Sequence, residues 1–269
     1  MSRYETMFAR GEGVFGAFVM LGDPTLEASA AILDVLVEAG ADMLEVGLPF
    51  SDPIADGPVI QAAAARALAA GTRPADCFAL LAEFRSRHPS VPVGILTYAN
   101  LVMARGRDHF YARAADAGVD SVLVADVPLL EAGPFAASAR AHGIAPVLIA
   151  AANTPPERLD AIAALGGGYT YCVARAGVTG ADQAVRFDHE AMLARLHAVG
   201  APPPVFGFGI STPAHVRAAL AAGAAGIICG SAIVDLAARG EPVRGFVQAM
   251  KAATRGGQGG PIGGPILVP

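Results

Sequence analysis

One glutamate stands inside an apolar run, and two aspartates follow it in a segment rich in turn residues. Glu45 lies within MLEVG (residues 43–47), and Asp52 and Asp56 lie within PFSDPIADGP (residues 49–58). A turn explains either aspartate taken alone, because Asp, Gly and Pro favour turns. No basic residue is adjacent to Glu45, and a buried carboxylate is costly unless it is paired or takes part in chemistry. We therefore predict an acid–base role for Glu45.

Other residue types narrow the chemistry. Asp126 also ends an apolar run, and it could be catalytic or could orient a neighbour. Lys251, near the C-terminus, is the only lysine of the chain, so a Schiff-base lysine in the body of the protein is not expected. The six histidines show no metal-ligand spacing.

Two glycine-containing segments could hold an anion. GFGIS (residues 207–211) and GSAIV (residues 230–234) each follow an apolar run. Glycines let backbone N–H groups approach an anion closely, and Ser231 adds a hydroxyl at a predicted helix start. We predict a phosphate site there. RAGVTGADQAVRFD (residues 175–188) is a long segment with glycines at two positions, and we predict a lid that closes over substrate.

The composition excludes several classes of protein. The net charge is −5, only 16% of the residues are charged, and no basic cluster indicates a nucleic-acid surface. No apolar run approaches the roughly 18 residues of a membrane span. The first residues do not have the basic and then apolar pattern of a secretory signal. The three cysteines are far apart, so we predict free buried thiols in an intracellular, cytoplasmic protein.

Short apolar runs alternate with alanine-rich helical stretches along the chain. Eight such runs begin at residues 16, 43, 93, 121, 145, 169, 205 and 225. This alternation predicts parallel strands covered by helices, and the length suits one (β/α)₈ TIM barrel of about 250 residues. A doubly wound open sheet is the alternative, but it rarely needs eight strands and no GxGxxG motif follows the first run.

We expect a single α/β domain over residues 1–255, with two additions to the barrel. A short helix is predicted near residues 4–10 and an extra helix over residues 74–88, after the second strand–helix unit. The Gly/Pro-rich tail, residues 256–269, is predicted to be disordered. Barrels of this kind carry catalytic groups at the carboxyl ends of strands and on the following loops. Glu45 and Asp56 have this placement.

Several motifs together resemble one family. They are FVMLGDP (18–24), LEVGLPFSDPIADGPVIQAA (44–63), YAN (98–100), DSVLVADVP (120–128), RAGVTG (175–180), GFGIS and GSAIV. From about residue 4 to residue 255 the chain resembles the tryptophan synthase alpha subunits. The resemblance implies a lyase that splits indole-3-glycerol phosphate into indole and glyceraldehyde 3-phosphate in tryptophan biosynthesis. It implies no cofactor and no metal.

The resemblance also implies site residues. Glu45 and Asp56 match the two catalytic carboxylates; Glu45 would shuttle the proton with a raised pKa, and Asp56 would hold the indole N–H. The implied substrate-binding residues are Phe18, Ile60, Leu96, Tyr98, Leu123, Tyr171, Thr179 and Phe208. The implied phosphate-binding residues are Gly180, Gly209, Gly230 and Ser231. Ala174 and Cys229 stand where the family commonly has serine, and neither is expected to change the reaction.

A partner is implied by the resemblance alone. Alpha subunits of this family bind a pyridoxal-phosphate beta subunit in an α2β2 heterotetramer, and residues 50–58 and 175–188 would face it. Three alternatives remain open at this point. The chain could be a stand-alone lyase that releases indole, which uses the same residues. It could be a barrel that has lost its chemistry and only activates a partner, but the presence of both Glu45 and Asp56 argues against this. On fold alone it could be another phosphate-binding barrel, such as a sugar-phosphate isomerase, and PFSDPIADGP is the reason to set that aside.

Overall fold

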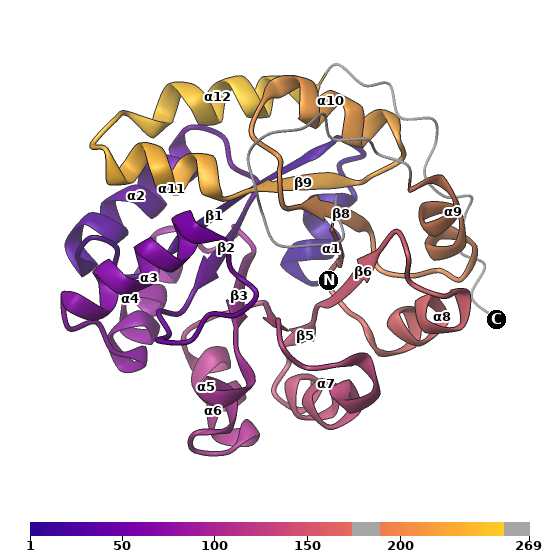
Figure 1. Cartoon of the computed structure of the whole chain (residues 1–269), viewed down its shortest axis with the longest axis horizontal. Coiled ribbons are helices and arrows are strands. Elements are labelled where there is room, and N and C mark those ends of the chain that lie inside the picture. The colour runs from indigo at the N-terminus through magenta and orange to yellow at the C-terminus, as the bar shows by residue number, and fades with distance from the viewer. Residues whose placement is uncertain (174–188, 256–269) are drawn as a thin grey trace.

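The chain forms a closed ring of parallel strands surrounded by helices (Figure 1). The computed structural model describes residues 1–173 and 189–255. Neighbouring strands in this part of the chain pair in the order β5-β4-β3-β2-β1-β9-β8-β7-β6. The strands are β1 (Val14–Met20), β2 (Met43–Gly47), β3 (Val93–Thr97), β4 (Ser121–Val124), β5 (Ala145–Pro146), β6 (Leu148–Ala151), β7 (Thr170–Val173), β8 (Pro204–Gly207) and β9 (Gly226–Cys229).

The predicted eight-stranded barrel is confirmed, with one strand in two pieces. β5 and β6 are parts of a single predicted run, and they are separated only by Val147. β5 pairs with β4 and β6 pairs with β7, so the same run joins the two ends of the sheet. The Val147 N–H still donates to the Val122 carbonyl at 3.0 Å, which continues the pairing across the break.

Helices cover the outside of the strands (Figure 1). They are α2 (Leu26–Glu38), α3 (Pro58–Ala69), α4 (Pro74–Arg87), α5 (Ala99–Met103), α6 (Arg107–Asp116), α7 (Ala132–Ala141), α8 (Pro156–Leu165), α9 (Glu190–Ala198), α10 (Pro213–Ala221), α11 (Ser231–Ala238) and α12 (Val243–Ala253), with a 3₁₀ turn η1 (Leu129–Glu131) before α7. The extra helix predicted over residues 74–88 is α4. Among the described residues, no helix is both long enough and apolar enough to span a membrane.

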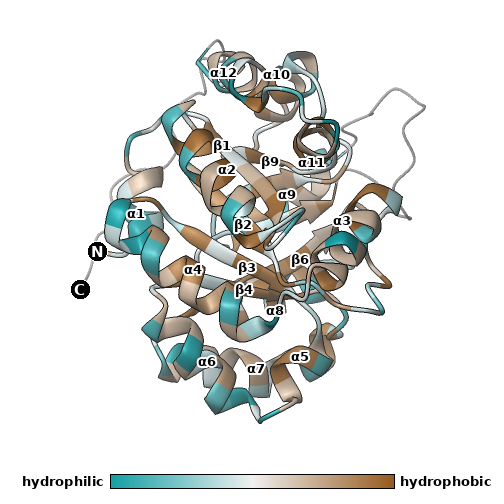
Figure 2. Ribbon diagram, turned by 90° about the vertical axis from the view of Figure 1, so that its left-hand side faces the viewer, coloured by the Kyte–Doolittle hydropathy of each residue, from teal (hydrophilic) through white to brown (hydrophobic). Residues whose placement is uncertain are grey.

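Alternation along the strands creates two apolar layers. Outward side chains such as Leu44, Val46 and Phe206 pack under the helices, whereas inward ones such as Met43 and Leu96 fill the barrel. Figure 2 shows the apolar colour concentrated on the strands and on the helix faces that cover them. Successive strand residues point to opposite faces, so Glu45, two residues after Met43, projects into the barrel.

Helix α1 (Arg3–Phe8) closes the amino end of the barrel. It lies inside the ring of outer helices in Figure 1. The Ser2 side chain and the Glu5 side chain form a capping box at its start. Arg3 donates to Asp120 at 2.7 Å, and Asp120 also accepts from Arg85 at 2.8 Å. These ion pairs hold α1 against the start of β4, which confirms the predicted N-terminal helix.

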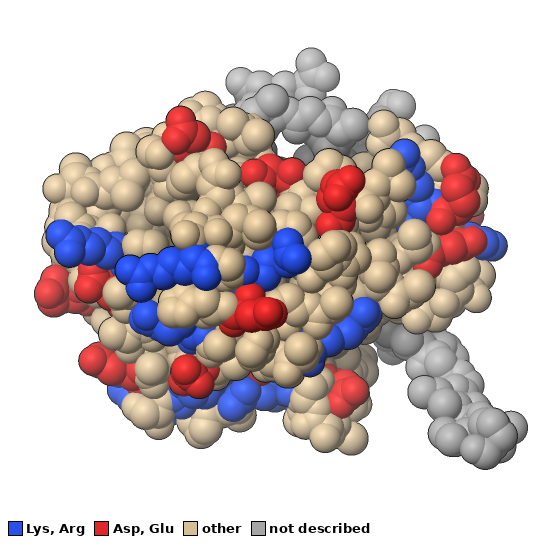
Figure 3. Space-filling view, turned by 90° about the horizontal axis from the view of Figure 1, so that it is seen from below, with Lys and Arg blue, Asp and Glu red and all other residues tan. Residues whose placement is uncertain are grey.

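The cysteines behave as predicted, since Cys77, Cys172 and Cys229 are buried free thiols. Within the described ranges no group of three or more His, Cys, Asp or Glu side chains could hold a metal ion. Figure 3 shows basic and acidic side chains interspersed on one face of the molecule, without a continuous basic patch there. The tail, residues 256–269, lies outside the described residues.

Candidate active site

Glu45 is a buried carboxylate with one occupied oxygen. Its side chain is on β2, in register with Phe18 of β1 and Gly94 of β3, and the residue is only 1% exposed. The Tyr169 hydroxyl donates to Glu45 Oε1 at 2.6 Å. Oε2 is buried and has no hydrogen-bond partner among the described residues. A buried polar atom without a partner is uncommon, and here it is an oxygen available to a ligand.

The surroundings of Glu45 favour its neutral form. The pKa of Glu45 is raised to about 7, chiefly by burial; the hydrogen bond from Tyr169 lowers it in part, and the charge of Asp56 raises it. A carboxyl group with a pKa near neutrality can both donate and accept a proton at physiological pH. This is the electrostatic setting that an acid–base catalyst needs.

Asp56 lies on the loop between β2 and α3, and it is 6% exposed. The loop is turned at this point, since the Asp56 N–H donates to the Pro53 carbonyl at 3.1 Å. The side chain is nevertheless buried, and burial raises its pKa, while the Tyr98 hydroxyl partly offsets that effect. Asp56 therefore takes part in a turn through its backbone and is at the same time a buried carboxyl group through its side chain. Asp52, by contrast, is exposed and accepts a hydrogen bond from Ser51 at 2.6 Å.

Tyr98 holds the loop that carries Asp56. It is 2% exposed, at the end of β3, and its ring stacks on Phe50 with centroids 5.3 Å apart. Its hydroxyl accepts from the Ala55 N–H at 3.2 Å. Asp126 follows β4 and accepts from the Ala99 N–H at 2.7 Å. Asp126 therefore holds the residue that follows Tyr98. This contact favours the orienting role over the catalytic role among the two roles considered for Asp126.

The charges of both carboxylates, Glu45 and Asp56, act on Tyr171. It is buried, and after burial itself the charges of Glu45 and Asp56 are the largest causes that raise its pKa. Its ring meets Phe208 nearly at right angles, with centroids 6.0 Å apart. A Cβ on Gly207 would overlap the Tyr171 hydroxyl and ring. Tyr171 therefore occupies space that is open only because residue 207 is a glycine.

Phe208 adopts a backbone conformation that is rare for a bulky residue. Its φ is 60°, and it is the only non-glycine residue with positive φ in the described part of the chain. Such strain persists where the surrounding structure fixes it, and it gathers at functional sites. Gly209 follows with φ 76°. The strand end at Gly207 thus turns sharply, with the Phe208 ring beside Tyr171.

The predicted indole-pocket residues gather in one place. Phe18, Ile60, Leu96, Leu123 and Tyr171 are buried members of a single inner cluster, and Phe208 packs at its edge. The cluster surrounds the interior into which Glu45 projects. Thr179, also predicted to contact the substrate, lies outside the described residues.

The predicted phosphate residues lie at the ends of two neighbouring strands. Gly209 follows β8, and Gly230 ends β9 and is the N-cap of α11. Ser231 is exposed at the first position of that helix. A Cβ on Gly230 would come 3.2 Å from Phe18 Cδ1, so this glycine approaches the inner cluster closely. Gly180 lies outside the described residues.

Tyr169 is a site residue that the sequence analysis did not single out. Strand periodicity could have found it, because Tyr169 and Tyr171 are two positions apart and face the same side of the strand. Tyr4 lies on α1, its ring centroid is 5.5 Å from that of Tyr169, and its hydroxyl bonds Ser121 Oγ at 2.8 Å. No local pattern links residues 4 and 169, so this contact required the fold.

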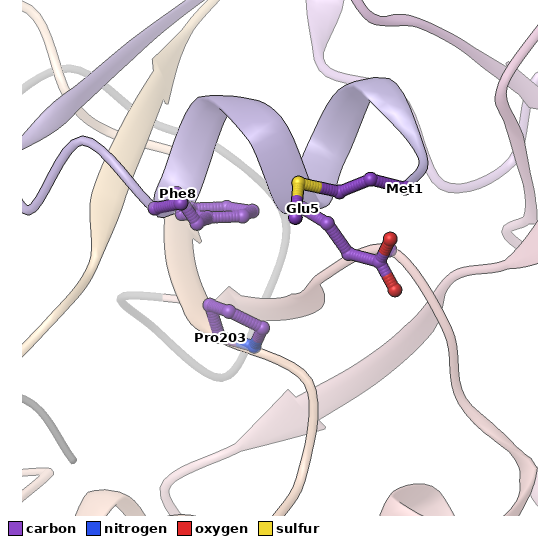
Figure 4. Close-up of a pocket in the computed structure, with 6 residues that line it drawn as sticks. Met1, Glu5, Phe8 and Pro203 are labelled. Carbon is purple, nitrogen blue, oxygen red and sulfur yellow. The ribbon is translucent and has the colours of Figure 1, made fainter. Parts of the chain in front are cut away.

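A hollow lies at the opposite end of the barrel. It has a volume of about 600 Å³ and is lined by α1 and by residues that precede β7 and β8, including Met1, Phe8 and Pro203 (Figure 4). Its one carboxylate, Glu5, already accepts from the Ser2 N–H at 2.6 Å. Catalytic groups of barrels lie at the carboxyl ends of the strands, so this hollow is not the candidate site.

Comparison with known proteins identifies relatives along the whole described barrel. A family model described as "Tryptophan synthase alpha chain" matches residues 4–255. The tryptophan synthase alpha chain of Shewanella oneidensis is 54% identical, covering 94% of this chain and 95% of its own. That of Escherichia coli O157:H7 is 52% identical, covering 95% of this chain and all of its own.

Solved structures agree with these sequence matches. A structure of Mycobacterium tuberculosis tryptophan synthase superposes with a TM-score of 0.86 at 31% identity, covering 95% of this chain and 99% of that one. A tryptophan synthase complex from Pyrococcus furiosus superposes with a TM-score of 0.80 at 34% identity, covering 90% of this chain and 98% of that one.

Proposed function

The chain belongs to the tryptophan synthase alpha chain family, and we propose that Glu45 and Asp56 carry out the acid–base steps of its reaction. It is a lyase of tryptophan biosynthesis that cleaves indole-3-glycerol phosphate into indole and glyceraldehyde 3-phosphate. The observation that supports the assignment is the pair of buried carboxyl groups on β2 and the loop that follows it, where the charge of Asp56 raises the pKa of Glu45.

The reaction breaks the bond between C3 of the indole ring and the adjoining glycerol carbon. C3 gains a proton and the hydroxyl on the glycerol carbon loses one, and that hydroxyl oxygen becomes the aldehyde oxygen of glyceraldehyde 3-phosphate. No electrons are gained or lost overall. Proton transfer by positioned side chains is therefore sufficient for this chemistry.

Glu45 is the proton carrier in this proposal. Its protonated form donates to indole C3, and the resulting carboxylate then accepts the proton of the glycerol hydroxyl, which restores the starting state. Oε2 is the atom assigned to these transfers, because Tyr169 occupies Oε1. A pKa of about 7 keeps both forms populated near neutrality.

Asp56 stabilises the charge that appears on the indole ring. Protonation at C3 converts the ring to an indolenine cation with the charge largely on nitrogen. A carboxylate that accepts a hydrogen bond from the ring N–H is stabilising there, more so in a site that excludes water. Tyr98, which bonds the loop at Ala55, keeps this carboxylate in reach.

The remaining predicted residues supply binding. Phe18, Ile60, Leu96, Tyr98, Leu123, Tyr171 and Phe208 would surround the indole ring and the glycerol chain, together with Thr179. Gly180, Gly209, Gly230 and Ser231 would hold the phosphate. The support for the ring is the common inner cluster, to which all the described residues of the first set except Tyr98 belong or pack, and the burial of Tyr98 itself. The support for the anion is the start of α11, where free N–H groups favour a phosphate.

We propose a beta subunit as the partner, in an α2β2 heterotetramer. Exposed apolar side chains occur on the loops that follow β2, β3 and β4: Ile54 is 76% exposed, Met103 47% and Leu130 80%. Apolar residues exposed on one end of a barrel are suited to an interface. Residues 50–58 and 175–188 are the segments assigned to this contact. A cytoplasmic location stays a prediction from the sequence.

Substitution of the two carboxylates tests the assignment. Purified Glu45→Gln and Asp56→Asn are mixed with indole-3-glycerol phosphate, with and without a beta subunit, and indole is followed. Each should lose about 10²–10⁴-fold in kcat. Asp116→Asn is the control, because Asp116 is an exposed aspartate at the end of α6, outside the loop assigned to the beta subunit, and it should keep the wild-type rate. A wild-type rate in either of the first two variants would remove that residue from the mechanism.

The same assay separates the partnered subunit from a stand-alone lyase. A subunit that depends on its partner is slow alone and accelerates when a beta subunit is added. Equal rates in the two conditions would favour the stand-alone reading.

A further inference from the structure

Three buried hydroxyl groups lie behind Glu45, away from the proposed substrate position. The Tyr169 hydroxyl donates to Glu45 Oε1. The Tyr4 hydroxyl and Ser121 Oγ bond each other at 2.8 Å, and Tyr4 also packs its ring on Tyr169. The residues come from β7, α1 and β4, and each is at most 2% exposed.

Gly94 provides the space in which these hydroxyl groups meet. Gly94 is the register neighbour of Glu45 on β3. A Cβ at this position would lie 2.6 Å from Ser121 Oγ, 3.1 Å from the Tyr4 hydroxyl and 3.7 Å from the Tyr169 hydroxyl. All three oxygens therefore surround one point beside Glu45, and a side chain at residue 94 would displace Ser121 Oγ and crowd the Tyr4 hydroxyl.

The contacts of α1 fix Tyr4 in this arrangement. Arg3 pairs with Asp120 at 2.7 Å, and Asp120 directly precedes Ser121. A Cβ on Gly168 would come 3.2 Å from the Tyr4 ring, so the chain before Tyr169 also packs closely on Tyr4. Tyr169 is consequently confined on one face by Tyr4, and its hydroxyl has Glu45 as its acceptor.

We propose that Tyr169, Tyr4 and Ser121 are positioning residues that hold Glu45 Oε1 and leave Oε2 directed at the substrate. The proposal rests on the assignment of Glu45 as the acid–base group. Tyr169 acts directly on the carboxylate, whereas Tyr4 and Ser121 act through Tyr169. Helix α1, far from Glu45 in sequence, thereby becomes part of the catalytic apparatus.

The cluster also affects the protonation of Glu45. The ionisable groups that act on Glu45 or respond to its charge are Asp56 on the following loop, Tyr169 and Tyr171 on β7, and Tyr4 on α1. Burial and the charge of Asp56 raise the pKa of Glu45, whereas the hydrogen bond from Tyr169 lowers it. The ionised carboxylate is the better acceptor, so removal of this donor raises the pKa of Glu45.

Conservative substitutions test the proposal in the full chain with its beta subunit. Tyr169→Phe keeps the ring and removes the hydroxyl. Because the protonated carboxyl group starts the reaction, the alkaline limb of the kcat/KM profile should move to higher pH by about one to two units, which is the value of a hydrogen bond to a charged group. Tyr4→Phe and Gly94→Ala should move it in the same direction by less. Tyr111→Phe is the matched control, because Tyr111 is equally buried but lies in the outer layer, and its profile should not move.

A second readout does not depend on activity. Titration of the Glu45 carboxyl carbon by ¹³C NMR, assigned with Glu45→Gln, should show the same shift in Tyr169→Phe. An unchanged midpoint in Tyr169→Phe, or an equal shift in Tyr111→Phe, would overturn the positioning role. Failure of the assignment of Glu45 is distinguishable, because Glu45→Gln would then retain activity whatever the NMR midpoint does.

Discussion

Gly207 and Tyr171 fit against each other with no room for a further atom. A Cβ on Gly207 would overlap the Tyr171 hydroxyl and ring. β8, which is followed by the strained Phe208, therefore has to end in a glycine, and the position of Tyr171 depends on that glycine.

We predict that Gly207→Ala displaces Tyr171 and lowers both stability and activity. Overpacking of a filled core costs about 1–3 kcal/mol, and the displaced ring would enter the proposed indole pocket. Urea unfolding and the rate of indole release measure the two effects. Gly133→Ala on α7 is the control, because a Cβ there meets nothing within 4 Å, and it should unfold no more easily than the wild type. Wild-type activity in Gly207→Ala would show that the Tyr171 position does not matter.

Glu45→Gln should change the pH dependence of stability. The pKa of Glu45 is about 7 in the folded protein against an ordinary value of 4.5. Below pH 4.5 both states hold the proton. Between the two values only the unfolded chain releases it, so the wild type loses stability as the pH rises, and the loss is complete above pH 7. The free energy of unfolding that is lost over this pH range is roughly 3 kcal/mol.

The glutamine variant lacks this loss because it does not titrate. Its free energy of unfolding relative to wild type should therefore increase between pH 4 and pH 8 by roughly 3 kcal/mol. Urea unfolding at both pH values measures it, and constant costs of the substitution cancel in the comparison. A difference between the variants that is the same at both pH values would contradict the raised pKa.

Tyr98→Phe should loosen the loop that carries Asp56. The stacking on Phe50 is retained, whereas the Ala55 N–H loses its acceptor. An unsatisfied buried donor costs about 1–3 kcal/mol, so we expect kcat/KM to fall by roughly 5- to 100-fold with a smaller change in overall stability. Steady-state kinetics and thermal unfolding together make the test. If the free energy of unfolding falls by as much as the free energy that corresponds to the loss in kcat/KM, the substitution has caused a general packing defect instead.

Removal of residues 256–269 should leave the barrel intact. The family match ends at residue 255, and α12 packs on α2, α10 and α11 before that point. We expect the shortened chain to keep its unfolding midpoint and its rate of indole release. A loss of either would assign the tail a role that the proposed domain boundary at residue 255 does not include.

The fold follows from local patterns to a large extent. The alternation of apolar runs and helical stretches predicts the eight-stranded barrel, and α1 and α4 appear where helices were expected. The interruption of the fifth strand at Val147 was not predicted, although its apolar run differs from the other seven in containing a proline, Pro146, which has no N–H to donate to a neighbouring strand. The break falls where the pairing partner changes from β4 to β7.

The site was predictable where its residues share one segment. Glu45 lies on β2 and Asp56 lies on the loop after it. Taken alone, only Glu45 was singled out, because a carboxylate inside an apolar run is not explained by a turn. Tyr98 was predicted as a pocket residue, but its bond to the Asp56 loop is a tertiary contact. The contacts of Tyr4 join segments more than one hundred residues apart, and no periodicity contains that information.

Proton transfer to indole is the step that tests the central claim most directly. Indole incubated with the protein and its beta subunit in D₂O should exchange the hydrogen at C3, because Glu45 protonates that carbon and then removes a proton from it. Proton NMR of the C3 position follows the exchange. The account predicts exchange at the wild-type rate in Asp116→Asn, at the exposed end of α6, and none above the protein-free rate in Glu45→Gln. Exchange at the wild-type rate in Glu45→Gln would contradict it.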